Sequence, residues 1–162
     1  MPYLIMLVIL GLGVYFSLKG QQKDPLAQMQ IWPYIKNPAP LDPLEINFCQ
    51  ALEQYLNKDL YVCPKMPLER IVYIPQNARL KRSMKDKIRD RWVDFAICDR
   101  KMELVCVIDL AGSNDSDAAF RPELQKIMKN AGISCFSFTP AYEYTGEMFE
   151  TINRLYQSGS YR

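Results

Sequence analysis

The N-terminal end of the chain carries the feature that most constrains its fold, a long apolar run without a charge. Residues 2–18 read PYLIMLVILGLGVYFSL and contain no Asp, Glu, Lys or Arg. A helix rising about 1.5 Å per residue over this run reaches the lower limit for crossing a bilayer. A cleaved signal peptide would have a basic start and a small-residue cleavage site, and a buried core helix would have polar positions. Neither pattern is present, so we expect residues 1–19 to be a transmembrane anchor.

The charges beside this run predict its orientation. Lys19 and Lys23 follow it directly, whereas only the α-amino group precedes it. The positive-inside rule then predicts a single-pass protein of the inner (cytoplasmic) membrane, with its C-terminal domain in the cytoplasm. Residues 20–41 are rich in proline and read as an extended linker. Residues 42–162 have a suitable length for one domain with its own core.

Histidine and cysteine usage excludes several kinds of chemistry. The chain has no histidine, which rules out Ser-His, Cys-His and other histidine-based acid–base mechanisms. The five cysteines include no C-x-x-C pair, so a zinc site lacks ligands. Most lie in apolar runs, which indicates buried reduced thiols; a disulfide framework is the alternative.

The order of apolar patterns predicts an α/β fold with a mixed sheet covered by helices. Three- and four-residue spacing predicts helices, and short apolar runs predict strands. We expect helices over 43–57, 117–131 and 145–157, and strands over 59–64, 92–99, 103–111 and 133–138. Residues 92–110 should form a hairpin, with Trp92 in the core. Residues 70–74 form an apolar run of undecided type.

Two carboxylates stand in the apolar strands of this hairpin. Asp94 lies near the start of one strand and Asp109 near the end of the next. An even-length turn places them on one face, about 5–8 Å apart. Like charges at that distance repel and need compensation. A divalent cation, solvent at the strand ends, or a Lys or Arg partner would each provide it.

Three stretches of this sequence resemble a known superfamily. They are LEINFCQALEQYL with Glu45, then RDRWVDFAICDRKMELVCVIDLAG, then KNAGISCFSF. The chain resembles the PD-(D/E)XK restriction-endonuclease-like superfamily, and more closely the domain of unknown function 2726 family within it, over residues 42–140. The resemblance implies a restriction-endonuclease-like mixed sheet flanked by helices. It also implies a nuclease that depends on Mg²⁺.

Carried over by position, this resemblance assigns catalytic roles to Glu45 on the first helix, Asp94 and Asp109. The two aspartates would hold Mg²⁺, which polarises a phosphate and activates water. The superfamily places a lysine two residues after the second acid, where this chain has Ala111, and a histidine of the related family falls near Asp115. The active site of this phosphodiesterase is therefore incomplete, unless a lysine from the next helix completes it. The two candidates on that helix are Lys126 and Lys129.

A strongly basic run precedes the hairpin. Residues 79–91 contain seven basic and two acidic residues. They could contact nucleic-acid phosphates, be a solvated surface with partial internal pairing, or attract anionic lipid headgroups. As a nucleic-acid-binding segment, the run would act through Arg79, Lys81, Arg82, Lys85 and Lys87.

These observations favour a membrane-anchored, cytoplasmic, nuclease-like domain that binds DNA or RNA and is degenerate or weakly catalytic. The alternative from another class is a non-catalytic assembly protein that uses the same fold to bind a protein partner at the membrane.

Overall fold

The computed structural model describes residues 12, 15, 34–112 and 119–161. Residues 39–162 form a unit of their own, separate from residues 1–38. The predicted anchor lies outside the described residues except for Leu12 and Tyr15, and so does most of the predicted linker. Within the described part of the chain, no helix combines the length and the apolar character needed to cross a bilayer.

The centre of this unit is a four-stranded mixed sheet with the spatial order β1-β2-β3-β4. The strands are β1 (Tyr61–Pro67), β2 (Trp92–Cys98), β3 (Leu104–Leu110) and β4 (Cys135–Phe138). Strands β1 and β3 run antiparallel to β2, which lies between them, and β4 runs parallel to β3. Strands β2 and β3 form the predicted hairpin, and they are almost continuously buried because helices cover both faces.

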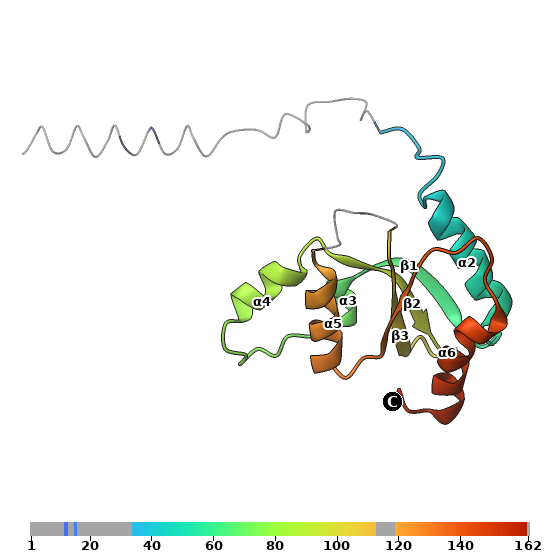
Figure 1. The fold of residues 1–162 in the computed structure, drawn as a ribbon. Helices are drawn as coiled ribbons and strands as arrows, with labels where there is room; N and C mark the ends of the chain where they lie inside the picture. The colour runs from blue at the N-terminus through green and yellow to red at the C-terminus, as the bar shows by residue number, and fades with distance from the viewer. Residues whose placement is uncertain (1–11, 13–14, 16–33, 113–118, 162) are drawn as a thin grey trace, which may run out of the picture. The chain divides into compact units, whose positions relative to one another are not determined.

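Helices flank the sheet on both sides (Figure 1). They are α2 (Pro43–Tyr55), α3 (Leu68–Ile71), α4 (Lys81–Ile88), α5 (Arg121–Asn130) and α6 (Gly146–Ser158). Helices α2 and α6 lie on one side of the sheet, and α3, α4 and α5 lie on the other. The expected mixed α/β architecture is therefore confirmed.

Two apolar clusters hold these layers together. The first lies between the sheet and the α2–α6 side, around Phe48 of α2 and Phe149 of α6, whose ring centroids are 5.8 Å apart. The second joins α3, α4 and α5 to the opposite face through Leu68, Ile88 and Met128, which are buried. Each helix presents one apolar stripe to the sheet, as amphipathic helices of layered domains do.

Several boundaries differ from those expected from the sequence. Strand β1 continues through Pro64 to Pro67. It is an edge strand, so its outer side has no neighbouring strand, and proline is tolerated in such strands. The undecided run 70–74 is mostly irregular after α3. Trp92 is 44% exposed at the start of β2, so the expectation that it lies in the core is wrong. Helix α5 begins only at Arg121, which puts Pro122 in its first turn, where proline is tolerated.

Candidate functional site

The hairpin register brings the two predicted aspartates to the same place on the sheet. Phe95 of β2 lies opposite Ile108 of β3, and continuing this register by one residue puts Asp94 opposite Asp109. The backbone ladder ends at the Phe95–Ile108 pair. Beyond it, the Asp94 side chain replaces the backbone as acceptor, and its Oδ2 accepts a hydrogen bond from the Leu110 amide at 2.7 Å. Asp94 thus fastens the end of β3 while its other oxygen remains available for a second contact.

Glu45 enters the same region from the first turn of α2. Its backbone amide donates to Asp42 Oδ1 at 2.8 Å, and the Asp42 amide donates to Glu45 Oε2 at 3.0 Å, which is a capping box. This motif explains why α2 begins where it does. It also holds Glu45 inside the protein, where it is 2% exposed. A carboxylate so buried needs a cationic or hydrogen-bonding partner.

That partner is Lys65 of β1, a residue the sequence did not single out. Its ammonium forms an ion pair with Glu45 Oε1 and donates to Asp94 Oδ1 at 2.8 Å. The register explains the second contact, because Lys65 lies between the Pro64–Phe95 and Met66–Val93 pairs and hence opposite Asp94. One lysine therefore joins an acid from α2 to an acid from β2.

The electrostatic environment keeps Lys65 charged. Burial lowers the pKa of this lysine, but its interactions with Asp94 and then Glu45 outweigh that effect and raise the pKa above its ordinary value of 10.5. The backbone of Lys65 has a φ of 51°, in the left-handed region that non-glycine residues adopt infrequently. Such conformations occur where the surrounding contacts fix them, as the two ion pairs do here.

Asp109 has its own cationic partner at the start of α5. The Nε of Arg121 lies 3.1 Å from Asp109 Oδ2, and an Nη of the same guanidinium is 3.4 Å from the Leu110 carbonyl oxygen. Asp109 is only 8% exposed. Of the compensations considered for the two aspartates, the structure thus supplies the cationic side chains, Lys65 for one and Arg121 for the other.

Acidic side chains outnumber basic ones by one in this cluster. The five charged side chains of the cluster comprise three carboxylates and two cations: Glu45, Lys65, Asp94, Asp109 and Arg121. Within the part of the chain that the structure describes, no three acidic or thiol side chains stand close enough to hold a metal ion. Mg²⁺, however, commonly uses one or two carboxylates and completes its shell with water and substrate phosphates. Asp94 and Asp109 are the carboxylates predicted for such a site, and each contacts a cationic side chain in the structure.

The lysines assigned from the sequence lie elsewhere on α5. Lys126 and Lys129 are exposed on its later turns, whereas Arg121, in the first turn, contacts Asp109. The sequence contained a weak sign of this arrangement. A cation in the first turn of a helix opposes the helix dipole, and Arg121 directly precedes a helix-initiating proline. Lys65 is the one charged residue in the run YVCPKMP, and a lone charge in an apolar strand likewise indicates an acidic partner.

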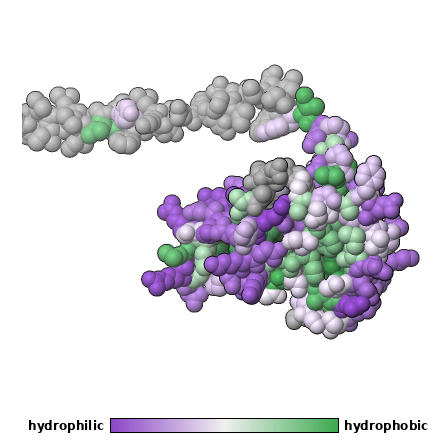
Figure 2. Space-filling model, in the orientation of Figure 1, coloured by the Kyte–Doolittle hydropathy of each residue, from purple (hydrophilic) through white to green (hydrophobic). Residues whose placement is uncertain are grey.

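The basic run forms α4 and the turns around it. Arg79, Arg82 and Lys85 are exposed, and the surface over α4 is mostly hydrophilic in Figure 2. Some of its cations are engaged: Lys87 forms an ion pair with Glu123 of α5, and Lys81 donates to the Gln76 side chain. The expected pairing inside the run is seen at Arg89, whose guanidinium lies 2.9 Å from Asp86 Oδ1.

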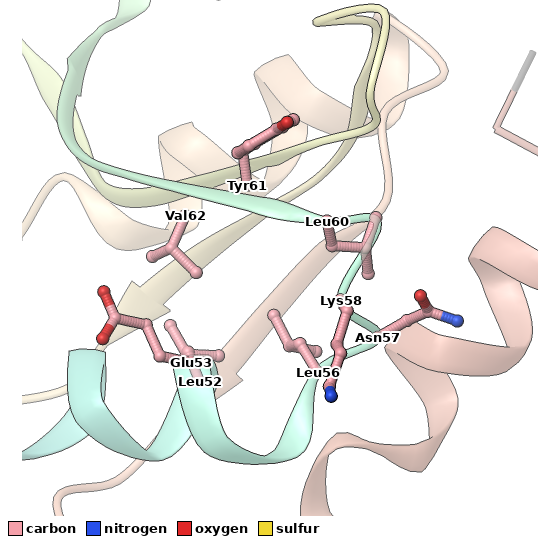
Figure 3. Close-up of a pocket in the computed structure, with 8 residues that line it drawn as sticks. All are labelled: Leu52, Glu53, Leu56, Asn57, Lys58, Leu60, Tyr61 and Val62. Carbon is pink, nitrogen blue, oxygen red and sulfur yellow. The ribbon is translucent and has the colours of Figure 1, made fainter.

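A separate hollow lies at the far end of α2 (Figure 3). It has a volume of about 360 Å³ and is enclosed by the end of α2, the following turn and the start of β1. Its lining is mixed: four aliphatic residues stand beside polar and charged ones, namely Leu52, Leu56, Leu60, Val62, Glu53, Asn57, Lys58 and Tyr61. It includes none of the residues predicted for catalysis or nucleic-acid binding.

All five cysteines are free thiols, as expected. Cys98 and Cys106 are buried and the other three are half-buried. Burial raises the pKa of Cys98 to about 11, with smaller contributions from Cys63 and Asp99. Burial and then the charge of Asp109 raise the pKa of Cys135 to about 11. Such thiols are protonated at neutral pH and are poor nucleophiles.

The fold and the cluster together define an α/β domain with acids and bases gathered at the end of its central hairpin. A family model described as "Protein of unknown function (DUF2726)" matches residues 41–155. The chain belongs to this family, as its sequence motifs led us to expect. No curated protein and no solved structure matches the chain.

Proposed function

We propose that this protein is a membrane-anchored, nuclease-like domain that binds nucleic acid, with its phosphodiester site at the Glu45–Lys65–Asp94 cluster and the adjoining Asp109–Arg121 pair. The observation that carries the proposal is the position of Lys65. The resemblance to restriction-endonuclease-like proteins asks for a cation beside the paired carboxylates, and Ala111 does not supply one. Lys65, which bridges Glu45 and Asp94, is such a cation.

The chemistry of the cluster suits a phosphate group accompanied by a divalent cation. Mg²⁺ held by Asp94 and Asp109 would neutralise negative charge at the phosphate and lower the pKa of bound water. The ammonium of Lys65 and the guanidinium of Arg121 would then be released in part from their carboxylates to contact phosphate oxygens. Arginine binds such oxygens through parallel hydrogen bonds.

Two helix ends add to this local field. Glu45 lies in the first turn of α2 and contacts Lys65, and Arg121 lies in the first turn of α5 and contacts Asp109. Helix N-termini carry partial positive charge and favour nearby anions. The positions of these two helix N-termini therefore support phosphate binding at the end of the central hairpin.

Catalysis should be weak in this arrangement. Lys65 forms an ion pair with Asp94, and Arg121 forms one with Asp109. Part of the positive charge of each is therefore offset before a phosphate binds. Removing one stabilising group from a site of this kind commonly lowers the rate about 10²–10³-fold. We expect slow cleavage in Mg²⁺ or Mn²⁺, abolished in Asp109→Asn and strongly reduced in Lys65→Gln. Lys126→Ala and Lys129→Ala, at exposed positions, should leave it unchanged.

Binding of labelled oligonucleotides to the full-length protein in mild detergent tests the proposal. Fluorescence anisotropy should show binding that is tighter with Mg²⁺ than with EDTA, and Asp109→Asn should remove this difference. Lys65→Gln should weaken binding in both conditions. Arg154→Gln serves as the matched control, because Arg154 is exposed on α6 and pairs only locally with Glu150. Urea denaturation of each variant separates loss of binding from loss of folding.

Two results would overturn the proposal. One is the absence of any oligonucleotide binding with or without metal, which would favour the alternative of an assembly protein with a protein partner at the membrane. The other is binding that Lys65→Gln and Arg154→Gln weaken equally, because the cluster would then have no special role.

A further inference from the structure

A second surface, on the side of α4, combines apolar residues, two lysines and an exposed aromatic ring. A hollow of about 340 Å³ lies between α4 and the chain that follows α3. Val72, Ile74 and Ile88 give it an apolar floor, and Lys81 and Lys85 line it from α4. Tyr73 also borders it and is 79% exposed.

The spacing of these residues explains how the groove forms. Lys81, Lys85 and Ile88 are four and three residues apart on α4 and therefore share one face. Ile88 is buried in the second apolar cluster, so this face turns toward the domain and its two lysines lean over the groove. Val72 and Ile74 also pack on that cluster, whereas Tyr73, between them, points outward. Alternation along this short segment thus sets an aromatic ring beside two cations.

We propose that this groove binds single-stranded nucleic acid, with one base stacked on Tyr73 and the adjoining phosphates on Lys81 and Lys85. The inference rests on the proposed function and adds the substrate class. Exposed aromatic rings beside a basic groove bind single strands because a base in a duplex is already stacked and cannot offer its face. Charge complementarity selects a phosphate-bearing partner over a neutral one.

The groove also contains a feature that opposes this partner. Glu69 lines it, and its carboxylate repels a phosphate that passes nearby. Replacing this one charge should therefore strengthen binding if the strand follows the groove. A loss-of-function and a gain-of-function variant are thus available at the same surface.

The test uses the full-length protein in mild detergent with fluorescein-labelled oligothymidine, oligouridine and a duplex of the same length. Tyr73→Ala should weaken single-strand binding roughly 5- to 100-fold, as loss of one stacked base does, and leave duplex binding unchanged. Tyr73→Phe should bind like the original protein. Glu69→Gln should tighten single-strand binding. Tyr142→Ala, at another exposed tyrosine, is the matched control. Comparison of the two single strands shows whether DNA or RNA is preferred.

Contrary results distinguish this inference from the proposed function. If oligonucleotides bind but Tyr73→Ala has no effect, or weakens single strand and duplex equally, the stacking groove is wrong and the proposed function stands. If Glu69→Gln leaves single-strand binding unchanged, the strand does not follow the groove. If the unmodified protein binds none of the three probes, both proposals fail. Because Tyr73 is exposed, its variants should retain the urea midpoint of the original protein, which confirms that they fold.

Discussion

Lys65 has a structural role and a proposed binding role, and experiments can measure the two separately. It compensates the buried charge of Glu45 in the folded protein, and it is the cation proposed to meet a phosphate. Glu45 itself is fixed by the capping box of α2, so its carboxylate cannot move away if the lysine is lost. A lone buried carboxylate is far more costly than one paired at hydrogen-bond distance. The stability and the binding of Lys65 variants are therefore both informative.

Lys65→Met should destabilise the domain by roughly 1–3 kcal/mol, because a buried acid loses its charged partner. Lys65 is partly exposed, which keeps the expected loss below that of a fully buried pair. Urea unfolding followed by circular dichroism measures the change. The matched variant Arg154→Met, at an exposed pair on α6, should cost at most about 0.5 kcal/mol. Equal losses in the two variants would contradict a structural role of Lys65.

At the scale of elements, α4 is the part of the domain that the sequence predicted to bind nucleic acid. In the structure, some of its cations are paired with acids and others line the groove. Lys87 forms an ion pair with Glu123 of α5, whereas Lys85 lines the groove beside Tyr73. A cation engaged with a neighbouring carboxylate has less charge to offer a phosphate. The basic residues of the run are therefore expected to contribute unequally.

Lys85→Gln should weaken oligonucleotide binding more than Lys87→Gln. It should also reduce the slope of log K against log salt by about 0.7 for a single strand, as expected for one lost phosphate contact. Lys87→Gln should change this slope little. Titrations at several salt concentrations, with the same oligonucleotide, give both slopes. If neither variant alters the slope, α4 is a solvated surface and does not contact phosphates.

The elements also show how far sequence reasoning can reach. The helices that become α2 and α6 and the β2–β3 hairpin follow from local apolar spacing and turn residues, and all are present. The position of Asp94 opposite Asp109 follows from the register of the hairpin, which is likewise local. Lys65 and Arg121 could not be assigned to these acids, because their contacts depend on which strand lies beside β2 and where α5 begins. Those are properties of the tertiary structure.

At the scale of the whole molecule, several buried or half-buried groups give the same dependence of stability on pH. Burial raises the pKa of Cys98 and Cys135 to about 11 from an ordinary value of 9.0. The pKa of Lys65 is also raised, because attraction to Asp94 and Glu45 exceeds the effect of burial. Each group binds protons more tightly in the folded than in the unfolded chain. The corresponding stability is complete below the unfolded pKa and is lost as pH rises toward the folded pKa.

We therefore expect the free energy of unfolding to fall between about pH 9 and about pH 11. Urea unfolding of the full-length protein at a series of alkaline pH values measures it. Cys98→Ala should flatten the decrease, because one of the titrating groups is removed. A free energy of unfolding that rises over this interval would contradict the assigned shifts.

The predicted anchor leads to an expectation about where the whole protein resides. Residues 2–18 carry no charge and Lys19 follows them directly. We expect the full-length protein to sediment with membranes and to resist carbonate extraction, since a spanning helix is held by apolar burial rather than by surface charge. A chain that begins at Ala39, where the compact unit starts, should remain in the supernatant. Release of the full-length protein by carbonate would contradict a spanning anchor.

The two ends of the segment formed by residues 68–91 lie side by side, and this has a consequence for how the family can diversify. The segment leaves the sheet after Pro67 and returns at Trp92, and these two residues are partners in the β1–β2 ladder. The Leu68 amide also donates to the Arg91 carbonyl at 2.9 Å, so both ends of the segment are held together. A segment with joined ends can change in length or composition at a small entropic cost, without moving the strands that it connects. Relatives could therefore exchange the basic helix and its groove for another binding surface while Lys65 and both aspartates kept their places.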